Sequence, residues 1–316
     1  MLFRDLCSSP ALEIKRYQDI DEFRESERYA QAESIPITAQ EFSVARATLS
    51  LPSCRLSLVR TFPRIINGYE LSKRLVIVIP MDRVSSVRVN GRSVGQSLIL
   101  LGGKVNCTVL EPEARLVAIL SLEGALSGQN LPGLGNGPLL LQLSNAGLAQ
   151  LQTTIRGLLR LAGSESITIM TAEMLLAAQE TLLASLNEAC FWAETHQYSD
   201  QKPLDRYKRI VDQLDELIGS NVVDLNNEKL ADSIGVSVRT LHTAALTICG
   251  TGPFHYGRLR RLWSVRRQLR TGAPGLTIKA TALAHGFWHL GDFSASYQVA
   301  FGELPSQTLK QARGRR

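Results

Sequence analysis

The chain has 316 residues, of which 44% are hydrophobic, and a formal net charge of +6. This length fits two domains of ordinary size, each able to bury a core. The five cysteines are scattered, odd in number and without C-x-x-C spacing, which excludes a disulfide framework and indicates reduced thiols in a cytoplasmic protein.

The sequence predicts no function in a membrane. The longest apolar runs, such as Leu75–Ile79, are far too short to cross a bilayer. Residues 1–5 include an acid and no apolar run follows them, so we expect no signal peptide and a cytoplasmic location.

The first 40 residues are polar and mixed, with a short helix expected from Ile20 and Asp19 or Asp21 as its cap. From about 37 to 122 apolar and polar residues alternate. Asn90-Gly91 is a strong hairpin signal, and the run before Pro80 predicts a buried strand. Further strands are expected near 56–58, 84–89, 97–101 and 116–120. Short strands separated by turns predict an antiparallel sandwich or barrel.

The histidines exclude one kind of site in this β-rich region. All five lie at position 196 or later: His196, His242, His255, His285 and His289. An open catalytic metal site needs a cluster of imidazole ligands, and no paired Asp/Glu spacing stands out in the strands. We therefore expect no metal and no cofactor.

A helical region follows a loop that is rich in Gly, Asn and Pro at 124–137. One expected apolar stripe consists of Leu148, Leu151, Ile155, Leu158 and Ala162. A second, after a cap at Thr171, consists of Leu175, Ala178, Leu182, Leu186 and Ala189. Each covers about two heptads, too short for a free coiled coil. Two interpretations stay open: the helices pack on the β-rich region, or they form a dimer interface.

A polar stretch at 199–203 predicts a linker, and a helix after it buries Val211, Leu214 and Ile218. Two helix-turn-helix units are then expected. In the first, Gly235 provides the turn and Ser237 caps the helix 238–249. The solvent side of that helix carries Arg239, Thr240, His242 and Thr243.

The second unit repeats this plan, with a turn at Gly286-Phe287 and a buried face of Phe293, Tyr297 and Phe301. A helix that begins at Pro253 joins the two units. We expect one of its faces to be buried and the other to carry Arg258, Arg260, Arg261, Arg266, Arg267 and Arg270. Such a rod could hold two helices ~34 Å apart, the distance between successive major grooves on one side of B-DNA.

Charge is unevenly distributed along the chain. From Val238 to Arg316, twelve Lys and Arg residues stand against two acids, Asp292 and Glu303, a net charge of +10, and the rest of the chain carries −4. A basic module joined to a mildly acidic one indicates a polyanionic partner for the C-terminal part.

These residues resemble the AraC/XylS family of bacterial transcription regulators. The matching motifs are L-A-x-x-x-G-V-S-x-R-T-L, G-x-x-P-x-x-Y-x-x-x-x-R-L, and G-F-W-H-L-G-x-F-S with F-G-E-x-P-S-x-T-L, which cover about a quarter of the chain. The resemblance implies an α+β multidomain protein. Its expected parts are a cupin-like sensor or dimerisation barrel (1–138), a helical connector (139–202) and an all-α DNA-binding domain (203–316) with units near 228–249 and 277–301.

The resemblance also implies site residues and partners. The second helix of each unit would read bases, with Arg239, Thr240, His242 and Thr243 in the first unit and His289, Leu290, Gly291, Asp292 and Ala295 in the second. Phosphates would be bound by Ser237, Arg258, Arg260, Arg261, Arg266 and Arg267, together with Arg313, Arg315 and Arg316. The implied partners are double-stranded DNA, a second copy of the chain and RNA polymerase. The barrel would either bind a small organic effector or serve only for structure and dimerisation. No Ser/His/Asp order, phosphate loop or metal cluster points to an enzyme.

The chain departs from the family in the second unit. Relatives often carry Arg where this chain has Thr243, and again at Asp292, Ala295 or Gln298. Residues 289–301 contain no Lys or Arg, and phosphates would repel Asp292 unless it accepts a bond from a cytosine amino group. We predict weak DNA binding that depends on dimerisation or a partner. The alternative is a protein-interaction module whose units have lost sequence-specific DNA binding.

Overall fold

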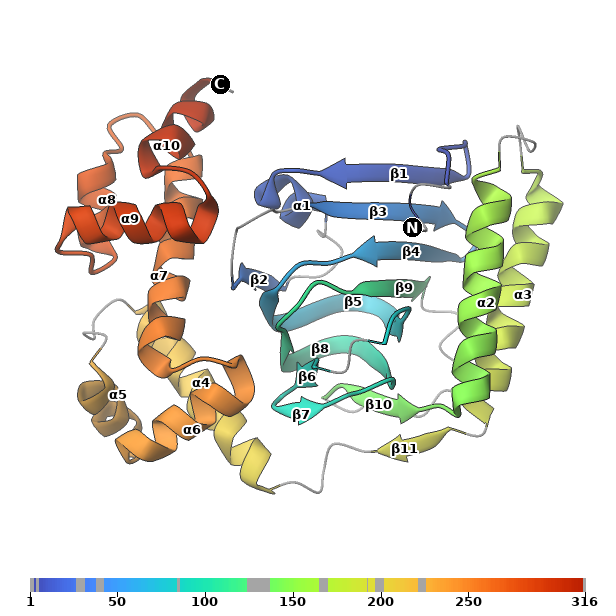
Figure 1. Cartoon of the computed structure of the whole chain (residues 1–316), viewed down its shortest axis with the longest axis horizontal. Helices are drawn as coiled ribbons and strands as arrows, with labels where there is room; N and C mark the ends of the chain where they lie inside the picture. The colour runs from blue at the N-terminus through green and yellow to red at the C-terminus, as the bar shows by residue number, and fades with distance from the viewer. Residues whose placement is uncertain are drawn as a thin grey trace.

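The computed structural model describes residues 3, 6–26, 32–37, 43–83, 86–123, 137–164, 170–191, 193–196, 202–220 and 226–314. An antiparallel β-rich region comes first, two long helices cover one end of it, and a helical domain lies at the other end (Figure 1). The α+β fold class expected from the sequence is therefore confirmed. The expected loop at 124–137 lies almost wholly outside the described residues.

The described strands of the β-rich region form a single eleven-stranded sheet. The strands are β1 (Leu12–Tyr17), β2 (Glu33–Pro36), β3 (Val44–Ser50), β4 (Cys54–Arg60), β5 (Arg64–Pro80), β6 (Arg88–Val89), β7 (Arg92–Ser93), β8 (Leu98–Glu111), β9 (Leu116–Glu123), β10 (Leu139–Gln142) and β11 (Glu194–His196). The main path is β1-β3-β4-β9-β5-β8-β10-β11, with β2 paired to β5 and β6 to β8. Among the described residues the path ends at β1 and β11 without closure, so the sheet is sandwich-like and not a closed barrel.

Long strands with irregular pairing give the sheet its bend. β5 pairs with β8 along most of its length and with β9 over its last part, and its register with β8 shifts between Asn67 and Tyr69 and between Leu71 and Leu75. Such bulges bend a strand and increase its twist. The Asn90-Gly91 hairpin is confirmed between β6 and β7, with φ of 48° and 81° at the two residues.

The first two strands were not predicted. β1 carries charged residues among its apolar ones, yet Leu12 and Tyr17 are buried because β1 pairs with β3. The short helix after it, α1 (Ile20–Ser26), begins as expected, since Asp19 Oδ1 accepts a bond from the Asp21 N–H at 2.8 Å.

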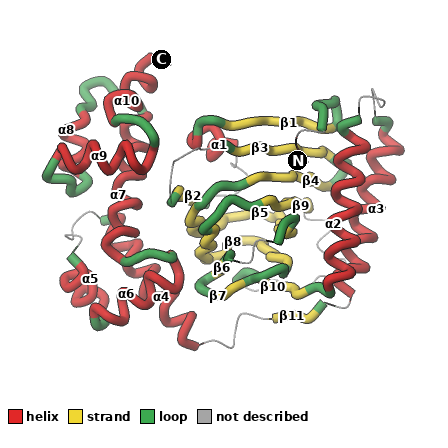
Figure 2. Tube along the Cα trace, in the orientation of Figure 1, coloured by secondary structure: helices red, strands yellow, loops and turns green. Residues whose placement is uncertain are grey.

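The helices α2 (Asn145–Ala162) and α3 (Ala172–Phe191) lie side by side against the sheet (Figure 2). Their buried faces join a cluster with sheet residues such as Leu49, Leu56 and Ile77. In α2 the buried position is Leu159, fully covered, whereas the predicted Leu158 is half-buried. Packing on the sheet accounts for these stripes, and β10 and β11, which lie within the expected connector, also belong to the sheet.

In its described residues, the C-terminal domain contains seven helices. They are α4 (Lys202–Gly219), α5 (Asn227–Ile234), α6 (Val238–Cys249), α7 (Pro253–Arg270), α8 (Ile278–Ala284), α9 (Leu290–Phe301) and α10 (Pro305–Gly314). In Figure 1, α5 and α6 lie near one end of α7, and α8 and α9 near the other. The structure confirms the expected caps: Ser237 accepts from the Thr240 N–H at 3.1 Å, and Gly235 turns with φ of 75°.

Two hydrophobic clusters cross from the sheet to the C-terminal domain. One contains Ile65 and Leu110 of the sheet with Tyr256 and residues of α4 to α6. The other contains Phe23 and neighbours in the β-rich region with Leu259 and Trp263 of α7. The two parts of the chain therefore share buried apolar surface. No helix within the described ranges is both long and apolar enough to cross a bilayer.

Candidate nucleic-acid interface

The second helix of the first unit, α6, presents a polar face to solvent. Of its expected base-reading side chains, Arg239, His242 and Thr243 are exposed and Thr240 is half-buried. The Thr243 hydroxyl donates to Arg239 O at 2.9 Å. Ser237, expected at a phosphate, is exposed and its hydroxyl caps the helix. We call α6 the first reading helix.

The far end of α6 rests on the β-rich region. Arg88 Nη1 donates to Leu246 O at 3.3 Å and to Thr247 O at 3.1 Å, in the last turn of the helix, where side chains can supply donors to the terminal carbonyl groups. Gly250 then ends the helix with φ of 74°, and a Cβ there would lie 2.7 Å from Leu110 Cδ2. The sheet thus fixes the position of the first reading helix from behind.

The second reading helix, α9, is held by aromatic packing on its inner side. Phe293 and Tyr297 are buried, and their rings lie 5.7 Å apart. Arg258 of α7 reaches across to α9, where its Nη2 donates to Ser296 Oγ at 2.5 Å and to Asp292 O at 3.3 Å. Of the expected base-reading residues, Leu290 is half-buried and the others are exposed: His289, Gly291, Asp292 and Ala295.

Two further residues at this surface escaped the sequence analysis. Trp288 is 69% exposed and Val299 is 73% exposed. Large apolar side chains on the surface are ordinary when scattered, but these two flank the expected reading residues of α9. The signal in the sequence was position: Trp288 directly precedes the motif residue His289, and Val299 lies one helical turn after Ala295, on the side of α9 away from the buried Phe293 and Tyr297.

The arginines of α7 do not form the open face that the sequence predicted. Arg261 and Arg266 are buried, with exposed fractions of 5% and 4%, and Arg258, Arg260 and Arg270 are half-buried. The reason is that α7 is packed between the helix-turn-helix units and the β-rich region. Of the six arginines in α7, Arg267 is the exposed one.

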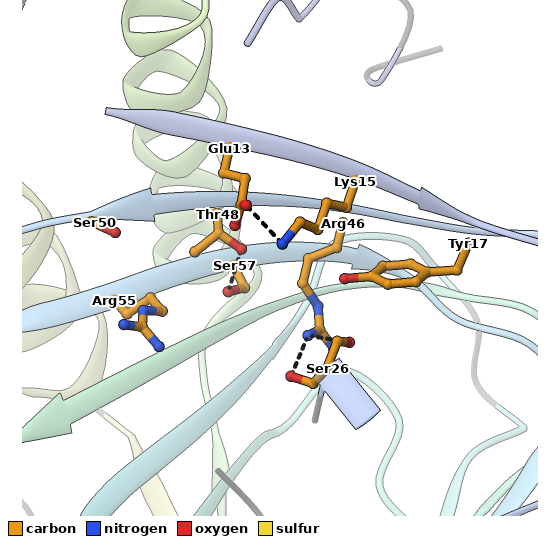
Figure 3. Close-up of a pocket in the computed structure, with 9 residues that line it drawn as sticks. All are labelled: Glu13, Lys15, Tyr17, Ser26, Arg46, Thr48, Ser50, Arg55 and Ser57. Atoms are coloured by element: carbon orange, nitrogen blue, oxygen red, sulfur yellow. Dashed lines mark hydrogen bonds and ion pairs between the residues drawn. The ribbon is translucent and has the colours of Figure 1, made fainter. Parts of the chain in front are cut away.

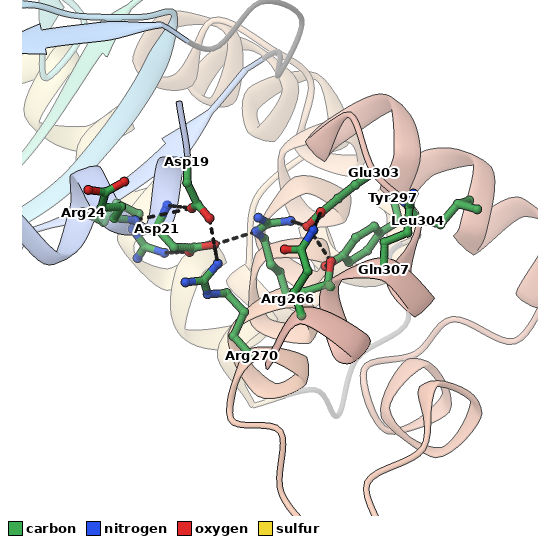
Figure 4. A network of polar contacts seen from close by, with 12 residues as sticks. Asp19, Asp21, Arg24, Arg266, Arg270, Tyr297, Glu303, Leu304 and Gln307 are labelled. Carbon is green, nitrogen blue, oxygen red and sulfur yellow. Dashed lines mark hydrogen bonds and ion pairs between the residues drawn. The ribbon is translucent and has the colours of Figure 1, made fainter. Parts of the chain in front are cut away.

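Acidic residues of the N-terminal part pair with one end of α7 (Figure 4). Arg266 Nε donates to Asp21 Oδ2 at 2.9 Å and its Nη1 donates to Glu303 Oε1 at 2.6 Å. Arg270 Nη1 lies 2.9 Å from Asp21 Oδ2 and 3.3 Å from Asp19 Oδ2. Burial acts to raise the pKa of Asp19, but the backbone N–H groups of Asp21 and Glu22, together with Arg270, lower it overall.

The middle of α7 forms a second polar contact with the sheet. Arg260 pairs with Glu33 of β2 and lies 3.2 Å, measured from its Nε, from Asp215 Oδ1 of α4. The Tyr256 hydroxyl donates to the same Asp215 at 2.7 Å, and Asn67 Nδ2 of β5 donates to the Tyr256 oxygen at 2.6 Å. Burial acts to lower the pKa of Arg260, but Asp215 and Glu33 raise it, so the guanidinium stays charged.

These contacts bear on the expected phosphate-binding residues. In this arrangement Arg260, Arg266 and Arg270 face carboxylates, and Arg261 lies beside the Gly286 turn, where a Cβ would come within 2.5 Å of Arg261 Nη1. Their contact with phosphate stays a prediction that requires the ion pairs to open. Arg313 is exposed and donates to Leu276 O at 2.8 Å, whereas Arg315 and Arg316 lie outside the described residues.

A polar hollow of about 280 Å³ lies at β1, β3 and β4 (Figure 3). Its basic side chains are Lys15, Arg46 and Arg55, against one acid, Glu13, which lies 2.8 Å from Lys15 Nζ. Arg46 Nη1 donates to Ser26 Oγ at 3.0 Å. In the described part of the chain no three His, Cys, Asp or Glu side chains gather as a metal site would require.

Comparisons with known proteins agree with this geometry. Residues 230–311 match a family described as a helix-turn-helix domain. The XylDLEGF operon transcriptional activator of Pseudomonas putida is 37% identical over 108 residues, which cover 34% of this chain and 33% of that protein. The HTH-type transcriptional activator RhaS of Pectobacterium atrosepticum is 28% identical over 171 residues, 54% of this chain and 57% of that protein. The match thus spans about a third of the first activator and rather more than half of the second.

A solved structure, of a probable AraC family transcriptional regulator from Rhodopseudomonas palustris, is 35% identical, with 33% of this chain and 98% of that one covered and a TM-score of 0.31. Two capped helix-turn-helix units joined by one helix define a helix-turn-helix DNA-binding protein. The chain belongs to the AraC family of helix-turn-helix transcriptional regulators, a family of regulators and not of enzymes. DNA is the partner that its C-terminal domain implies.

Proposed function

We propose that the chain is a sequence-specific transcription activator that places α6 and α9 in two successive major grooves. The observation that carries this proposal is the exposure of polar faces on both reading helices, which lie near the two ends of one helix, α7. Two readers on one side of B-DNA need a separation of ~34 Å. The similar activators of Pseudomonas and Pectobacterium support activation over repression. A DNA partner implies a bacterial cytoplasm, and activation implies contact with RNA polymerase.

Selection of duplexes from a random pool by the full chain tests this function. We expect an enriched site with two boxes about ten base pairs apart, the repeat of one helical turn. Footprinting should then protect both boxes on one side of the duplex. A pool that stays random after repeated rounds at low salt would refute sequence-specific binding.

The second candidate function is a protein-interaction module that no longer reads DNA. It is favoured by α9, which carries an exposed acid, Asp292, and no Lys or Arg. The same selection separates the two functions, because an interaction module would enrich no sequence. The exposed Arg239 on α6 favours DNA reading, since Arg paired to guanine is the commonest specific contact in the major groove.

We further propose that the N-terminal region controls how α7 meets DNA. Glu33, Asp19 and Asp21 occupy the guanidinium groups that phosphates would otherwise bind. A state with these ion pairs opened would present more positive charge to the duplex. Each additional phosphate contact steepens the dependence of log affinity on log salt by about 0.9.

Two partly exposed carboxylates allow a direct test of this control. The double variant Asp19→Asn, Glu33→Gln should bind the selected duplex more tightly and with a steeper salt slope than the natural chain. Glu22→Gln is the matched control, because Glu22 lies in α1 and is exposed. An unchanged slope in the double variant would show that these pairs do not restrain α7.

An effector and a second copy complete the proposal. The hollow lined by Lys15, Arg46 and Arg55 favours a small organic anion, because three cations there face one acid. Thermal-shift titration with small carboxylates, against neutral sugars as control, tests for such an effector. Arg55→Gln should reduce any shift.

For dimerisation, the proposed contact is the exposed side of α3, where Leu176 is 46% exposed and Phe191 is 75% exposed. Sedimentation of Leu176→Glu against the natural chain tests that contact.

A further inference from the structure

The exposed side of α9 carries apolar side chains and no Lys or Arg, whereas a DNA-reading helix usually carries basic donors there. Ala295 and Val299 lie four residues apart on one face, and Asp292 precedes them by three and seven residues, so the three side chains share that face. Trp288 stands just before the helix and is 69% exposed, and Val299 is 73% exposed. We call Trp288, Ala295 and Val299 the α9 apolar surface.

This surface is held in place from behind. The buried Phe293, Tyr297 and Ala300 fix the rotation of the helix. Arg258, the cation that touches α9, donates to Ser296 Oγ and Asp292 O and therefore points at the helix itself. An open hollow of about 430 Å³ lies between α7, α9 and Ile37 of the N-terminal part, and its lining includes the apolar Phe254 and Val299. The helix thus cannot turn a different face outward without leaving its core.

The chemistry of base edges selects what such a face can recognise. Guanine offers two acceptors in the major groove and is most often read by Arg or Lys, neither of which occurs in residues 289–301. Thymine offers its C5-methyl group, which apolar side chains contact. Asp292, an acceptor, would be repelled by phosphates but not by the amino group of a base. A surface without cations gains its affinity from buried apolar area.

We infer that α9 recognises thymine C5-methyl groups, so that the box it reads is rich in thymine whereas the box read by α6 contains a guanine for Arg239. This inference rests on the proposed DNA binding and adds the chemistry of the second box. Trp288, Ala295 and Val299 are the specificity-determining residues.

Replacement of thymine by deoxyuridine removes the methyl group and leaves the pairing edge unchanged. In the selected duplex, deoxyuridine throughout the box read by α9 should weaken binding roughly three- to fourfold for each methyl contacted, the effect of exposing one methyl-sized group. The same replacement in the box read by α6 is the internal control and should change affinity little. Footprints of α6 and α9 variants assign the boxes.

Variants of the protein identify the side chains. Trp288→Ala and Val299→Ser should each reduce the deoxyuridine penalty in the second box and flatten its thymine preference in a repeated selection. Leu304→Ala is the matched control, because Leu304 is 38% exposed and follows α9 outside its reading face. Circular dichroism of each variant checks that the domain keeps its helices.

The possible outcomes are distinct. If no duplex is enriched, the proposed function fails and the inference with it. If a site is enriched but deoxyuridine in the second box has no effect, the inference alone is overturned. If Trp288→Ala lowers activation in a reporter strain while duplex affinity and box preference stay unchanged, the surface contacts a protein, and the inference is again overturned.

Discussion

Two glycines of the C-terminal domain show how much one residue can depend on its surroundings. Gly235 and Gly250 both end a helix in the left-handed region, with φ of 75° and 74°. A Cβ at Gly235 would meet nothing within 4 Å, whereas one at Gly250 would lie 2.7 Å from Leu110 Cδ2 on β8. Gly235 is needed for its φ alone. Gly250 is needed both for its φ and for the approach of α6 to the sheet.

Alanine at each glycine should separate these two causes. Gly235→Ala should lower the free energy of unfolding by about 1–2 kcal/mol, the cost of the left-handed conformation. Gly250→Ala should cost about 1–3 kcal/mol more, because the buried Leu110 must also move. Urea unfolding of the two variants measures the difference. Equal losses would mean that α6 does not rest on β8.

His285 makes stability sensitive to pH. Burial, with Arg267 and Arg261 nearby, lowers the pKa of His285 from its usual 6.5. The unfolded chain therefore binds this proton more readily than the folded chain. The stability that the folded chain gains by holding His285 neutral is fully present above pH ~6.5 and is lost as the pH falls below that value.

Thermal unfolding between pH 8 and pH 5.5 tests this. The melting temperature of the natural chain should fall over the acidic half of that range, and His285→Gln should fall less. His255→Gln, at an exposed position, serves as the control and should follow the natural chain. A parallel fall in both variants would assign the proton to another group.

At the scale of the element, α7 combines two kinds of arginine. Arg266 is 4% exposed and bridges Asp21 and Glu303, while its guanidinium also lies 4.8 Å from the centre of the Phe301 ring. Its neighbour Arg267 has a side chain that is 63% exposed, 3.9 Å from Glu33. The sequence could not distinguish them, because the identity of the face that meets the β-rich region depends on residues more than 200 positions away.

Replacing Arg266 and Arg267 separately by methionine should change the free energy of unfolding by different amounts. Arg266→Met removes a charged partner from the buried Asp21, which keeps Arg270, and from the half-buried Glu303, and should cost up to about 3–5 kcal/mol of unfolding free energy. Arg267→Met should cost at most about 1 kcal/mol, as for exposed ion pairs. Chemical denaturation of both variants provides the comparison. A loss in Arg267→Met as large as that in Arg266→Met would contradict the packing of α7 described above.

At the scale of the whole molecule, the sheet and the reading domain share two buried clusters. Leu110 lies in one of them together with Ile248 of α6 and Tyr256 of α7. Leu56 lies instead in the cluster that α2 and α3 form with the sheet. A change in the sheet could therefore reach the first reading helix by direct contact, without passing along the chain from β11 to α4.

Hydrogen exchange can follow that connection. Leu110→Ala should cost about 2–5 kcal/mol and should raise exchange in α6 as well as in β8. Leu56→Ala, the matched control, should raise exchange in the sheet and α2 and leave α6 nearly unchanged. If α6 exchanged alike in both variants, the coupling would be global and not carried by the Leu110 contact.

The sequence by itself determined the local features of this protein. The cap at Ser237, the first-turn proline Pro253, the turn at Gly235 and the hairpin at Asn90-Gly91 depend on neighbouring residues alone, and each was predicted correctly. The strand β1 was missed because its pairing with β3 outweighs its polar composition.

The sequence also determined the two helix-turn-helix units, because their apolar spacing and turn residues lie within short stretches. Only the tertiary structure decided which arginines of α7 face carboxylates and which face solvent. It also decided that Trp288 and Val299 flank the residues expected to read bases. The physical reason is that burial and ion pairing depend on segments brought together from distant parts of the chain, such as Asp21 and Arg266, whose contact no local pattern encodes.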